Sequence, residues 1–219
     1  MGYIISINGN DGSGKTTQIS ILKKNSSKNT FFPPDIAEYG VFPNLSEKEF
    51  FEWWFFNSTI EEFCTAIYNG IQYRNEDIAR QCKPISFLDK GIDTFDSRIL
   101  ANFLCRGMDE TYTIQKMNAI KEKIGIQDNE SIKIFLLSNS DIDERLRISK
   151  NRKGTLFGQT YYDKYQKKLN EIIEKQIQKG TYTIVNASGS IEDVNNKIIY
   201  AIKQDLLNQT NRKYLEERY

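Results

Sequence analysis

The sequence of 219 residues contains no histidine, only three cysteines and only four prolines. Without histidine, every mechanism that uses an imidazole base is excluded, and so is a zinc site with imidazole ligands. The cysteines Cys64, Cys82 and Cys105 are odd in number, widely spaced and outside any metal-binding spacing. We therefore interpret them as reduced thiols of a cytoplasmic protein.

A strong excess of charge and a long apolar run are missing as well. Lys and Arg number 30 against 29 Asp and Glu, a net charge of +1, so no broad cationic surface for a nucleic acid polymer or an anionic membrane is expected. No apolar run approaches the roughly 18 residues of a membrane-spanning helix. The first residues lead directly into a predicted strand rather than a signal peptide. We expect a cytoplasmic protein with neither nucleic acid nor membrane as partner.

The sequence does contain enough apolar material for a core. Hydrophobic residues make up 39% of the chain and aromatic residues 12%, which is typical of a folded rather than a disordered protein. The length fits one domain, and we predict a single domain over residues 1–219. No internal repeat is found, which excludes solenoids and propellers.

Short apolar runs alternate with helical patterns along the chain. Strands that are apolar throughout and separated by helices are typical of a buried parallel sheet with helices on both faces. The fold prediction is therefore α/β, in three layers, with about five parallel strands. The predicted strands are Tyr3–Asn8, Ile85–Asp89, Ile132–Ser138 and Tyr182–Asn186, with a weakly marked fifth near Thr30–Phe32.

Two pairs of residues have the spacing of capping boxes at helix starts. Ser46 with Glu49 opens an aromatic helix through Phe56, and Ser58 with Glu61 opens a longer helix to about Gln81. The polar tail Asn208–Tyr219 either frays or extends the last helix. The remaining predicted helices are Gly14–Lys24, Asp93–Arg106, Glu110–Ile124, one that starts at Asp141 with Glu144, Tyr161–Lys179 and Ile191–Leu207.

A complete phosphate-binding motif follows the first predicted strand. Residues 9–16 read Gly-Asn-Asp-Gly-Ser-Gly-Lys-Thr and match G-x-x-x-x-G-K-[ST] between a strand and a helix. The glycines let successive backbone N–H groups turn toward phosphate oxygens, and the helix N-terminus adds its dipole. Lys15 is expected to reach the β- and γ-phosphates of ATP, and the Thr16 hydroxyl to bind Mg²⁺. The predicted ATP contacts in this loop are Gly9, Asn10, Gly12, Ser13, Gly14, Lys15, Thr16 and Thr17.

The loop resembles that of the thymidylate kinase family. Residues 10–18 read Asn-Asp-Gly-Ser-Gly-Lys-Thr-Thr-Gln, where the family commonly has G-x-D-G-x-G-K-T-T-Q. Residues 184–194, Ile-Val-Asn-Ala-Ser-Gly-Ser-Ile-Glu-Asp-Val, resemble the family's last strand and helix. The likeness covers the chain from end to end at low similarity, and no guanine motif N-K-x-D favours a GTPase. It implies a P-loop kinase fold with a mobile lid, ATP and Mg²⁺ as cofactors, and a homodimer as an alternative to a monomer.

A carboxylate ends the second apolar strand. Asp89 is followed by Lys90 and Gly91, where the family has Asp-Arg-aromatic. Ligands bind at this edge of open α/β sheets. The resemblance places Asp89 near Mg²⁺ and the transferred phosphoryl group, and Lys90 at the position of the acceptor-binding Arg. Lysine replaces a planar fork by a flexible point charge, and a solvated Asp–Lys pair is the alternative interpretation.

The helix after this strand carries three charges where the family usually shows Ser-x-x-Ala-Tyr-Gln. Asp93, Asp96 and Arg98 follow one another on one helix face. They indicate either an acceptor unlike dTMP, with Arg98 as a substrate contact, or a face of rearranged ion pairs. Asp11 matches a loop carboxylate that approaches the sugar 3′-hydroxyl in the family, so it too is a candidate acceptor contact.

The segment Tyr68–Arg74 resembles the family's acceptor helix, L-F-x-A-x-R. Arg74 then binds the acceptor phosphate; its alternative is a surface ion pair with a neighbouring acidic residue. The family's base-stacking aromatic is replaced by Gly70, so Tyr68 or Tyr73 is expected to take that place. The dense aromatic run Phe50–Phe56 is interpreted as core or dimer interface, or alternatively as a wall around a base.

A basic segment lies between the third and fourth apolar strands. Residues 144–153 carry five positive charges and one negative charge, and Gly154 and Gly158 are possible hinges. In kinases of this type a mobile lid brings arginines onto the donor phosphates and excludes water. The lid is predicted at about residues 145–158, with a solvated helix end as the alternative. Its candidate phosphate contacts are Arg145, Arg147 and Arg152.

Together these features predict an ATP- and Mg²⁺-dependent phosphotransferase, first of all a nucleoside monophosphate kinase resembling thymidylate kinase. A phosphate acceptor is already anionic at pH 7 and needs no strong base, in agreement with the missing histidines. The first alternative is a kinase for a hydroxyl of a nucleoside, modified nucleotide or nucleotide-like natural product, in which Asp89 also serves as the base. The second is a catalytically weak nucleotide-binding regulator.

Overall fold

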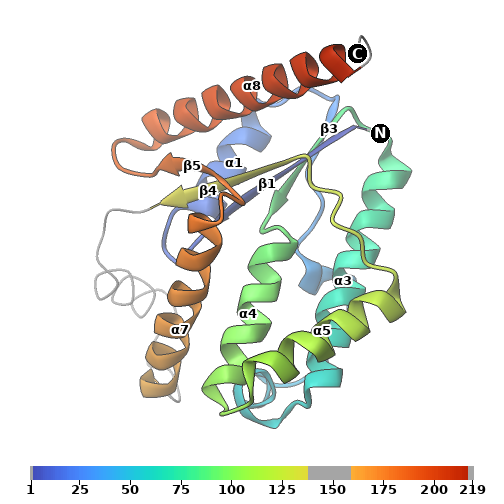
Figure 1. Cartoon of the computed structure of the whole chain (residues 1–219), viewed down its shortest axis with the longest axis vertical. Helices are drawn as coiled ribbons and strands as arrows, with labels where there is room; N and C mark the ends of the chain where they lie inside the picture. Colours follow the sequence, from blue (N-terminus) through green and yellow to red (C-terminus); the bar gives the residue numbers. More distant parts are fainter. Residues whose placement is uncertain (1, 138–158, 217–219) are drawn as a thin grey trace.

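One parallel sheet of five strands forms the centre of the molecule in the computed structural model, which describes residues 2–137 and 159–216. The strands lie in the order β2-β3-β1-β4-β5 (Figure 1). This confirms the predicted α/β fold with its parallel sheet. The strands are β1 (Tyr3–Gly9), β2 (Thr30–Phe31), β3 (Ile85–Asp89), β4 (Ile132–Leu137) and β5 (Thr183–Asn186).

The register of the sheet brings the ends of β1 and β3 together. Ile7 of β1 pairs with Asp89 on one side and with Ile134 on the other. The phosphate-binding loop leaves β1 two residues later, so it starts beside the carboxylate that ends β3. The strand β2 has only two residues and pairs only with β3, which explains its weak sequence signal.

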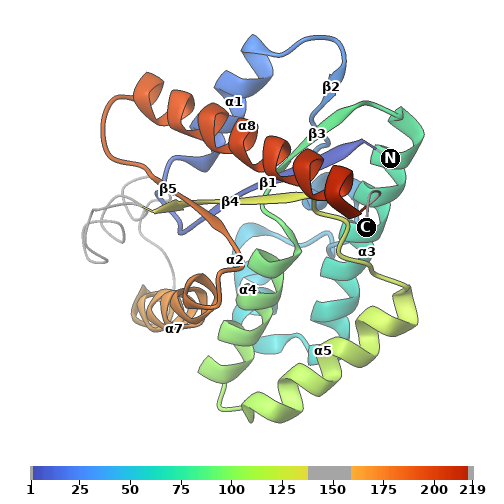
Figure 2. The ribbon, with the colours of Figure 1, turned by 45° about the horizontal axis from the view of Figure 1, so that its top comes forward.

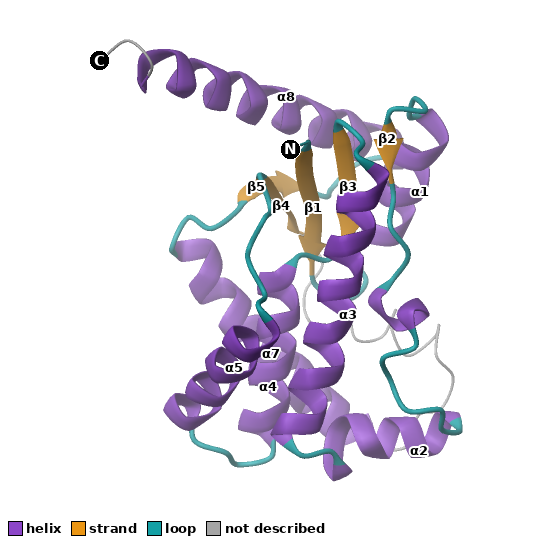
Figure 3. Ribbon diagram, turned by 90° about the vertical axis from the view of Figure 1, so that its right-hand side faces the viewer, coloured by secondary structure: helices purple, strands orange, loops and turns teal. Residues whose placement is uncertain are grey.

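Helices cover both faces of the sheet (Figure 2). The first and last helices, α1 and α8, lie together on one face, and α3, α4, α5 and α7 lie on the other (Figure 1). The last helix continues to Glu216 and projects past the sheet (Figure 3), so the tail extends it. The helices are α1 (Lys15–Asn25), the 3₁₀ turn η1 (Ile36–Tyr39), α2 (Glu47–Glu52), the π-helical η2 (Trp53–Asn57), α3 (Ile60–Gln81), α4 (Ile92–Cys105), α5 (Glu110–Ile124), α7 (Gln159–Gln178) and α8 (Ile191–Glu216).

The central strand β1 presents two chemically different faces. Ile5 and Ile7 are fully buried and pack with apolar residues of α1 and α8, such as Leu22. The alternate residues Ser6 and Asn8 are also fully buried but polar. Side chains alternate across a strand, so these two polar groups face the helices α3 and α4, and they have to find hydrogen-bond partners there.

The two predicted capping boxes have different outcomes. At α2 the box is confirmed, because Ser46 and Glu49 exchange side-chain to backbone hydrogen bonds. At α3 the prediction of Ser58 with Glu61 is wrong by one residue. Thr59 caps the helix and accepts from the Glu62 N–H at 3.2 Å. Ser58 is instead buried beneath Arg106, whose Nη1 donates to the Ser58 carbonyl at 2.6 Å.

The aromatic run forms a π-helical turn after α2 rather than one continuous α-helix. Trp53 and Trp54 pack against Phe63 of α3, and Phe55 is buried against Tyr165 of α7. Most of the run therefore belongs to the core between α3 and α7. In the part of the chain that the structure describes, no helix has the length and apolarity required to span a membrane.

Removal of the cap hydroxyl tests the corrected start of α3. Thr59→Ala should lower the free energy of unfolding by about 1 kcal/mol, because the Glu62 N–H loses its acceptor. Thr59→Ser retains the hydroxyl and should remain within about 0.5 kcal/mol of the wild type. Urea unfolding followed by circular dichroism measures both; an unchanged midpoint for Thr59→Ala would contradict this cap.

Candidate active site

The loop between β1 and α1 has a shape that depends on glycine. Gly12 and Gly14 have φ angles of 84° and 87°, in the left-handed region that other residues rarely adopt. At Gly9 a Cβ atom would lie 2.5 Å from Ser13 Oγ. The motif therefore has the backbone conformation that turns its N–H groups inward, as predicted for a phosphate cradle.

Lys15, the first residue of α1, bends back over this loop. Its Nζ donates to the carbonyls of Gly9 at 2.9 Å and Asn10 at 2.8 Å. The side chain is buried, and burial lowers the pKa of Lys15 to about 8, although the nearby Asp11 acts in the opposite direction. The ammonium is thus held at the mouth of the loop by weak neutral acceptors, which anionic phosphate oxygens can replace.

Thr16 and Asp89 meet across the end of the sheet, as predicted for a magnesium site. Thr16 Oγ1 donates to Asp89 Oδ2 at 3.4 Å. The other carboxylate oxygen, Asp89 Oδ1, is buried and accepts no hydrogen bond from the described residues. A hydroxyl and an underused carboxylate oxygen fit a hard cation such as Mg²⁺. Among the residues that the structure describes, no group of three or more Cys, Asp or Glu forms a separate metal centre.

Lys90 lies between two carboxylates. Its Nζ is 3.2 Å from Asp35 Oδ2 and 4.0 Å from Asp89 Oδ1. Its φ angle of 72° is unusual for a residue with a side chain, and its side chain is only 20% exposed. Lys90 is therefore held between carboxylates rather than solvated, and part of its charge is already neutralised.

Sequence reasoning missed Asp35. It lies four residues beyond β2, at the same edge of the sheet as Asp89, and its Oδ1 also accepts from the Ala37 N–H at 3.0 Å. Burial opposes its ionisation, but the Lys90 ammonium and the Ala37 amide outweigh burial, so the pKa of Asp35 lies below its ordinary value. The available signal was its place after the predicted strand Thr30–Phe32, since the ends of parallel strands share one edge.

Arg74 comes from α3 and is buried beside Lys90. Only 3% of the residue is exposed, and its Nη1 donates to the Lys90 carbonyl at 2.9 Å. The alternative of a surface ion pair is wrong: the neighbouring Asp77 accepts from Tyr39 and pairs with Arg80. Arg74 and Lys90 are therefore neighbours, and their contact is between the guanidinium and the backbone of Lys90.

Asp11 of the phosphate loop is held by two helices. Its Oδ1 pairs with Arg98 of α4 at 2.7 Å, while its Oδ2 accepts from the Tyr162 hydroxyl and Gln166 Nε2 of α7, each at 3.0 Å. Both predicted acceptor contacts, Asp11 and Arg98, are therefore bound to each other. Their ion pair connects the phosphate loop to α4 and α7.

The other charges of α4 are also paired within the protein. Asp93 accepts from Lys133, and Asp96 accepts from Lys121 and from the Tyr68 hydroxyl. Of the two interpretations of this helix, rearranged ion pairs therefore account for Asp93 and Asp96. Tyr68 is fully buried by this arrangement, so its ring lies in the core and presents no face to a ligand.

The space where the family's stacking aromatic would lie is filled. A Cβ at Gly70 would approach Ile36 Cβ at 3.0 Å and Val41 Cγ2 at 3.1 Å. The segment that follows β2 thus packs directly on the α3 backbone, and it leaves no room for a ring at this position. Tyr73, the other candidate, is 46% exposed on the same helix. The predicted lid, with Arg145, Arg147 and Arg152, lies outside the described residues.

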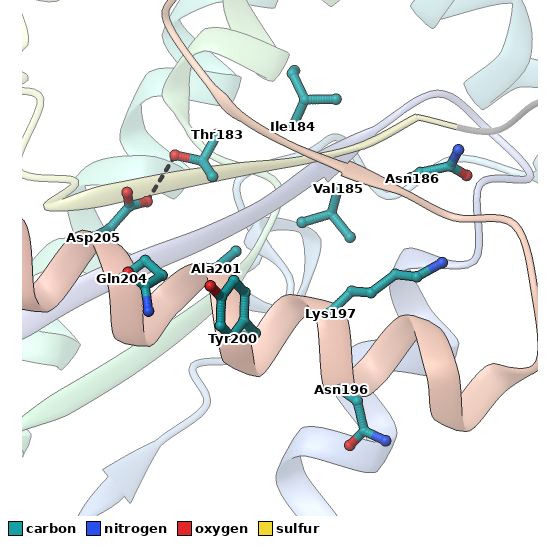
Figure 4. A pocket seen from close by; sticks show the side chains of 10 residues that line it. All are labelled: Thr183, Ile184, Val185, Asn186, Asn196, Lys197, Tyr200, Ala201, Gln204 and Asp205. Atoms are coloured by element: carbon teal, nitrogen blue, oxygen red, sulfur yellow. Dashed lines mark hydrogen bonds between the residues drawn. The ribbon is translucent and has the colours of Figure 1, made fainter.

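A separate open groove of about 590 Å³ lies between β5 and α8. Figure 4 shows Tyr200 and Lys197 of α8 facing β5, and the hydrogen bond of 2.7 Å between Thr183 and Asp205 that closes one end. Its lining contains none of the residues gathered at the ends of β1 and β3. We therefore place the candidate active site at the phosphate loop and not in this groove.

No family model matches the sequence, and no curated protein matches it either. Solved structures do match the fold. A deoxyadenosine kinase from M. mycoides, solved with the products dCMP and dCDP, has a TM-score of 0.63 at 15% identity over 92% of this chain and 99% of its own. The thymidylate kinase from Candida albicans has a TM-score of 0.63 at 20% identity, over 93% and 92%. The chain has the fold of these two nucleotide-binding kinases.

The lowered pKa of Lys15 predicts a pH dependence of ATP binding. Only the charged ammonium attracts phosphate, so the Kd of ATP should rise up to about tenfold between pH 7 and pH 9. Lys15→Arg keeps its charge over this range and should show a flat profile. Isothermal titration calorimetry without Mg²⁺ measures the Kd of both proteins. A wild-type Kd that does not change with pH would contradict the assignment of Lys15 as an ATP contact.

The lowered pKa of Lys15 should weaken ATP binding as the pH rises, but it has the opposite effect on the free energy of unfolding. Between pH 8 and about 10.4 the unfolded chain binds more protons at Lys15 than the folded chain does, so the contribution of Lys15 to the free energy of unfolding rises with pH. Comparison of urea unfolding of wild type and Lys15→Arg over this range isolates that contribution from other groups.

Proposed function

We propose that this protein is an ATP- and Mg²⁺-dependent phosphotransferase whose acceptor is a hydroxyl group of a nucleoside or a nucleoside-like molecule. The fold shared with deoxyadenosine and thymidylate kinases and the complete phosphate loop support the donor half of this proposal. The arrangement of charges around Lys90 supports the acceptor half. The proposal includes a single kinase domain over residues 1–219 and a cytoplasmic location.

On the donor side, the loop glycines present backbone N–H groups to the phosphates, and Lys15 neutralises the β- and γ-phosphates. Thr16 and Asp89 would hold Mg²⁺, which supplies positive charge to the phosphate oxygens. Phosphoryl transfer demands mostly positioning and charge neutralisation of this kind. The basic segment at residues 145–158 is proposed to contribute Arg145, Arg147 and Arg152 to the same task.

The observation that carries the acceptor assignment is the position of Lys90 between Asp35 and Asp89. Arg98 is likewise neutralised by Asp11. A phosphate monoester would place about two negative charges beside these carboxylates, where like charges repel. A neutral hydroxyl acceptor meets no such repulsion, and the carboxylates can accept its hydrogen bond.

The reaction then requires a group that accepts the hydroxyl proton. Asp35 is ionised at neutral pH and lies on the acceptor side, whereas Asp89 contacts the Thr16 hydroxyl on the metal side. As the acceptor oxygen forms its bond to the γ-phosphorus, the bond to the bridging β–γ oxygen breaks and ADP leaves. The hydroxyl proton passes to Asp35 Oδ2, which replaces the earlier expectation of Asp89 as the base.

A nucleoside monophosphate acceptor is the second candidate, and one observation favours it. Arg74 has a buried Nε that makes no hydrogen bond within the described part of the chain. A phosphate oxygen at this edge of the sheet can accept a hydrogen bond from this unused Nε–H. The thymidylate kinase among the structural neighbours acts on an acceptor of this class, as its name states.

An acceptor panel separates these candidates. The purified protein is incubated with ATP, Mg²⁺ and either nucleosides or nucleoside monophosphates, and the products are identified by mass spectrometry beside ADP release. We expect nucleosides to become monophosphates. Formation of diphosphates from monophosphates alone would overturn the hydroxyl assignment, and a protein that binds ATP but transfers phosphate to neither class would be the regulator.

Lys15→Ala tests whether the phosphate loop is catalytic. Loss of one charge from the β- and γ-phosphates should reduce phosphoryl transfer by more than about 100-fold. Thermal unfolding serves as the control that the variant is folded. Turnover near the wild-type rate in a folded Lys15→Ala protein would contradict an enzymatic role of this loop.

Substitutions at Lys90 and Asp35 test the acceptor side. Asp35→Asn should lower kcat by about 10² to 10⁴ with the KM of ATP nearly unchanged, because a proton acceptor is lost. Lys90→Arg should impair a hydroxyl acceptor, since a bidentate guanidinium would bind the Asp35 carboxylate that is proposed to accept the proton, whereas it would preserve or improve activity on a monophosphate. Steady-state kinetics with both acceptor classes distinguish these results.

A further inference from the structure

The corner that joins β3 to α4 is held at each of its backbone N–H groups. The N–H of Lys90 donates to the Ile7 carbonyl at 3.1 Å, and that of Gly91 donates to Asn8 Oδ1 at 2.8 Å. The N–H of Ile92 donates to Glu130 Oε1 at 2.6 Å. The first two partners belong to the adjacent strand β1, but Glu130 comes from the connection between α5 and β4, which is 38 residues away in sequence.

The carboxylate of Glu130 occupies the space of the missing side chain at residue 91. A Cβ atom built on Gly91 would lie 2.1 Å from Glu130 Oε2, 2.6 Å from Oε1 and 2.7 Å from Cδ. The backbone of Gly91 itself is ordinary, with φ −84° and ψ 177°, so any residue can adopt it. A side chain at residue 91 would therefore require the Glu130 carboxylate to move away from its position on the Ile92 N–H, whereas the backbone conformation makes no such demand.

The corner has a strained backbone at Lys90, a residue of the proposed acceptor side. Lys90 has a left-handed φ of 72°, which costs energy for a residue with a Cβ. Arg74 of α3 binds the Lys90 carbonyl, and Glu130 binds the N–H of the next peptide. Such strained conformations persist only where surrounding contacts determine them. Glu130 and Arg74 are two of these contacts.

Glu130 is also unlike an ordinary surface carboxylate. Its Oε2 is buried, and burial raises its pKa, while Ser6, the Ile92 N–H and Arg74 act in the opposite direction. A buried carboxylate at a helix start is retained at a cost in desolvation. It binds the first residue of α4, and it lies close enough to Ser6 of β1 and Arg74 of α3 for both to lower its pKa.

We propose that Glu130 is a positioning residue of this site: its carboxylate takes the place of a side chain at residue 91 and holds the Lys90–Ile92 corner so that Asp89 and Lys90 point at the acceptor. Its effect on catalysis rests on the proposed function, whereas its effect on the corner does not. Displacements of about 1 Å at reacting groups cost up to about 100-fold in rate, so the position of this corner determines turnover.

The test is a double-mutant cycle between Gly91 and Glu130. Gly91→Ala should push the carboxylate off the Ile92 N–H and lower kcat/KM for the acceptor by about 10- to 100-fold, with the KM of ATP within about twofold. Glu130→Ala should cause a loss of similar size. Because the three atoms nearest to the added Cβ all belong to Glu130, Gly91→Ala should cause no further loss in the Glu130→Ala background. Additive losses would overturn the proposal.

Asp96→Asn is the matched control. It removes the charge of another partly buried carboxylate, which belongs to α4 and binds Lys121 of α5 and Tyr68 of α3 rather than the corner. It should lower thermal stability while the acceptor kcat/KM stays within about twofold of wild type. A loss in Asp96→Asn equal to that in Glu130→Ala would show that the effect is one of general stability, and the proposal would fail.

A readout that needs no activity separates this proposal from the proposed function. The amide proton resonance of Ile92 should move upfield in Glu130→Gln and in Gly91→Ala, because the charged acceptor is lost or displaced. An unmoved resonance overturns the role of Glu130 even if the enzyme is active. If the resonance moves but the wild type phosphorylates no acceptor, then the proposed function fails and the control of the corner by Glu130 stands.

Discussion

The side-chain amide of Asn8 is the interaction on which the arrangement of the site depends. It lies fully buried in the central strand, one residue before the phosphate loop. Its Oδ1 accepts from the Gly91 N–H and the Thr94 hydroxyl, and its Nδ2 donates to Ser6 Oγ. A buried polar group left without partners costs about 1–3 kcal/mol. Asn8 therefore fixes α4 relative to β1, and with them the Lys90–Ile92 corner relative to the phosphate loop.

Hydrogen bonds and ion pairs also hold the charged side chains around this amide in place. The cations predicted to meet a ligand are already bound to protein groups: Arg98 to Asp11, Lys90 to Asp35, and Arg74 to a backbone carbonyl. The side chains are thus held in place before any ligand binds. On the proposed acceptor side positive and negative groups largely cancel, so the net charge is small. Fixed dipoles and ion pairs of this kind stabilise developing charge without reorganisation. They also disfavour a second dianion beside ATP.

The sequence was sufficient where structure is determined by local contacts. The phosphate loop, the capping box at Ser46 and the strands β1, β3 and β4 depend on residues that are neighbours in the chain, and the fold class followed from their alternation. The start of α3 shows the limit of local reasoning. Ser58 and Thr59 precede Glu61 and Glu62, so two registers of a capping box were available. Burial of Ser58 by Arg106, 48 residues away, selects the second.

Distance along the chain also explains which site residues were missed. Asp35 follows a strand of two residues that has almost no pattern of its own. Glu130 lies in a loop, and nothing within a few residues indicates that its carboxylate reaches the start of α4. Both become visible only when the sheet order and the path of the α5–β4 connection are known.

Two of the departures from the thymidylate kinase pattern, those at Gly70 and Gly91, have a common physical reason. At Gly70 and at Gly91 the sequence lacks a side chain that the family has, and in both places atoms from a distant segment fill the volume: Ile36 and Val41 at the first, Glu130 at the second. Interiors are close-packed, so a large side chain at either position requires its distant partner to move or to change. Each of these differences therefore involves a glycine together with the distant residues that fill its space. At Gly70 an apolar segment closes the place of a stacking ring, and at Gly91 a carboxylate replaces a ring beside Arg74. Both changes lie on the side of the sheet edge where we propose that the acceptor binds, while the phosphate loop keeps the full motif.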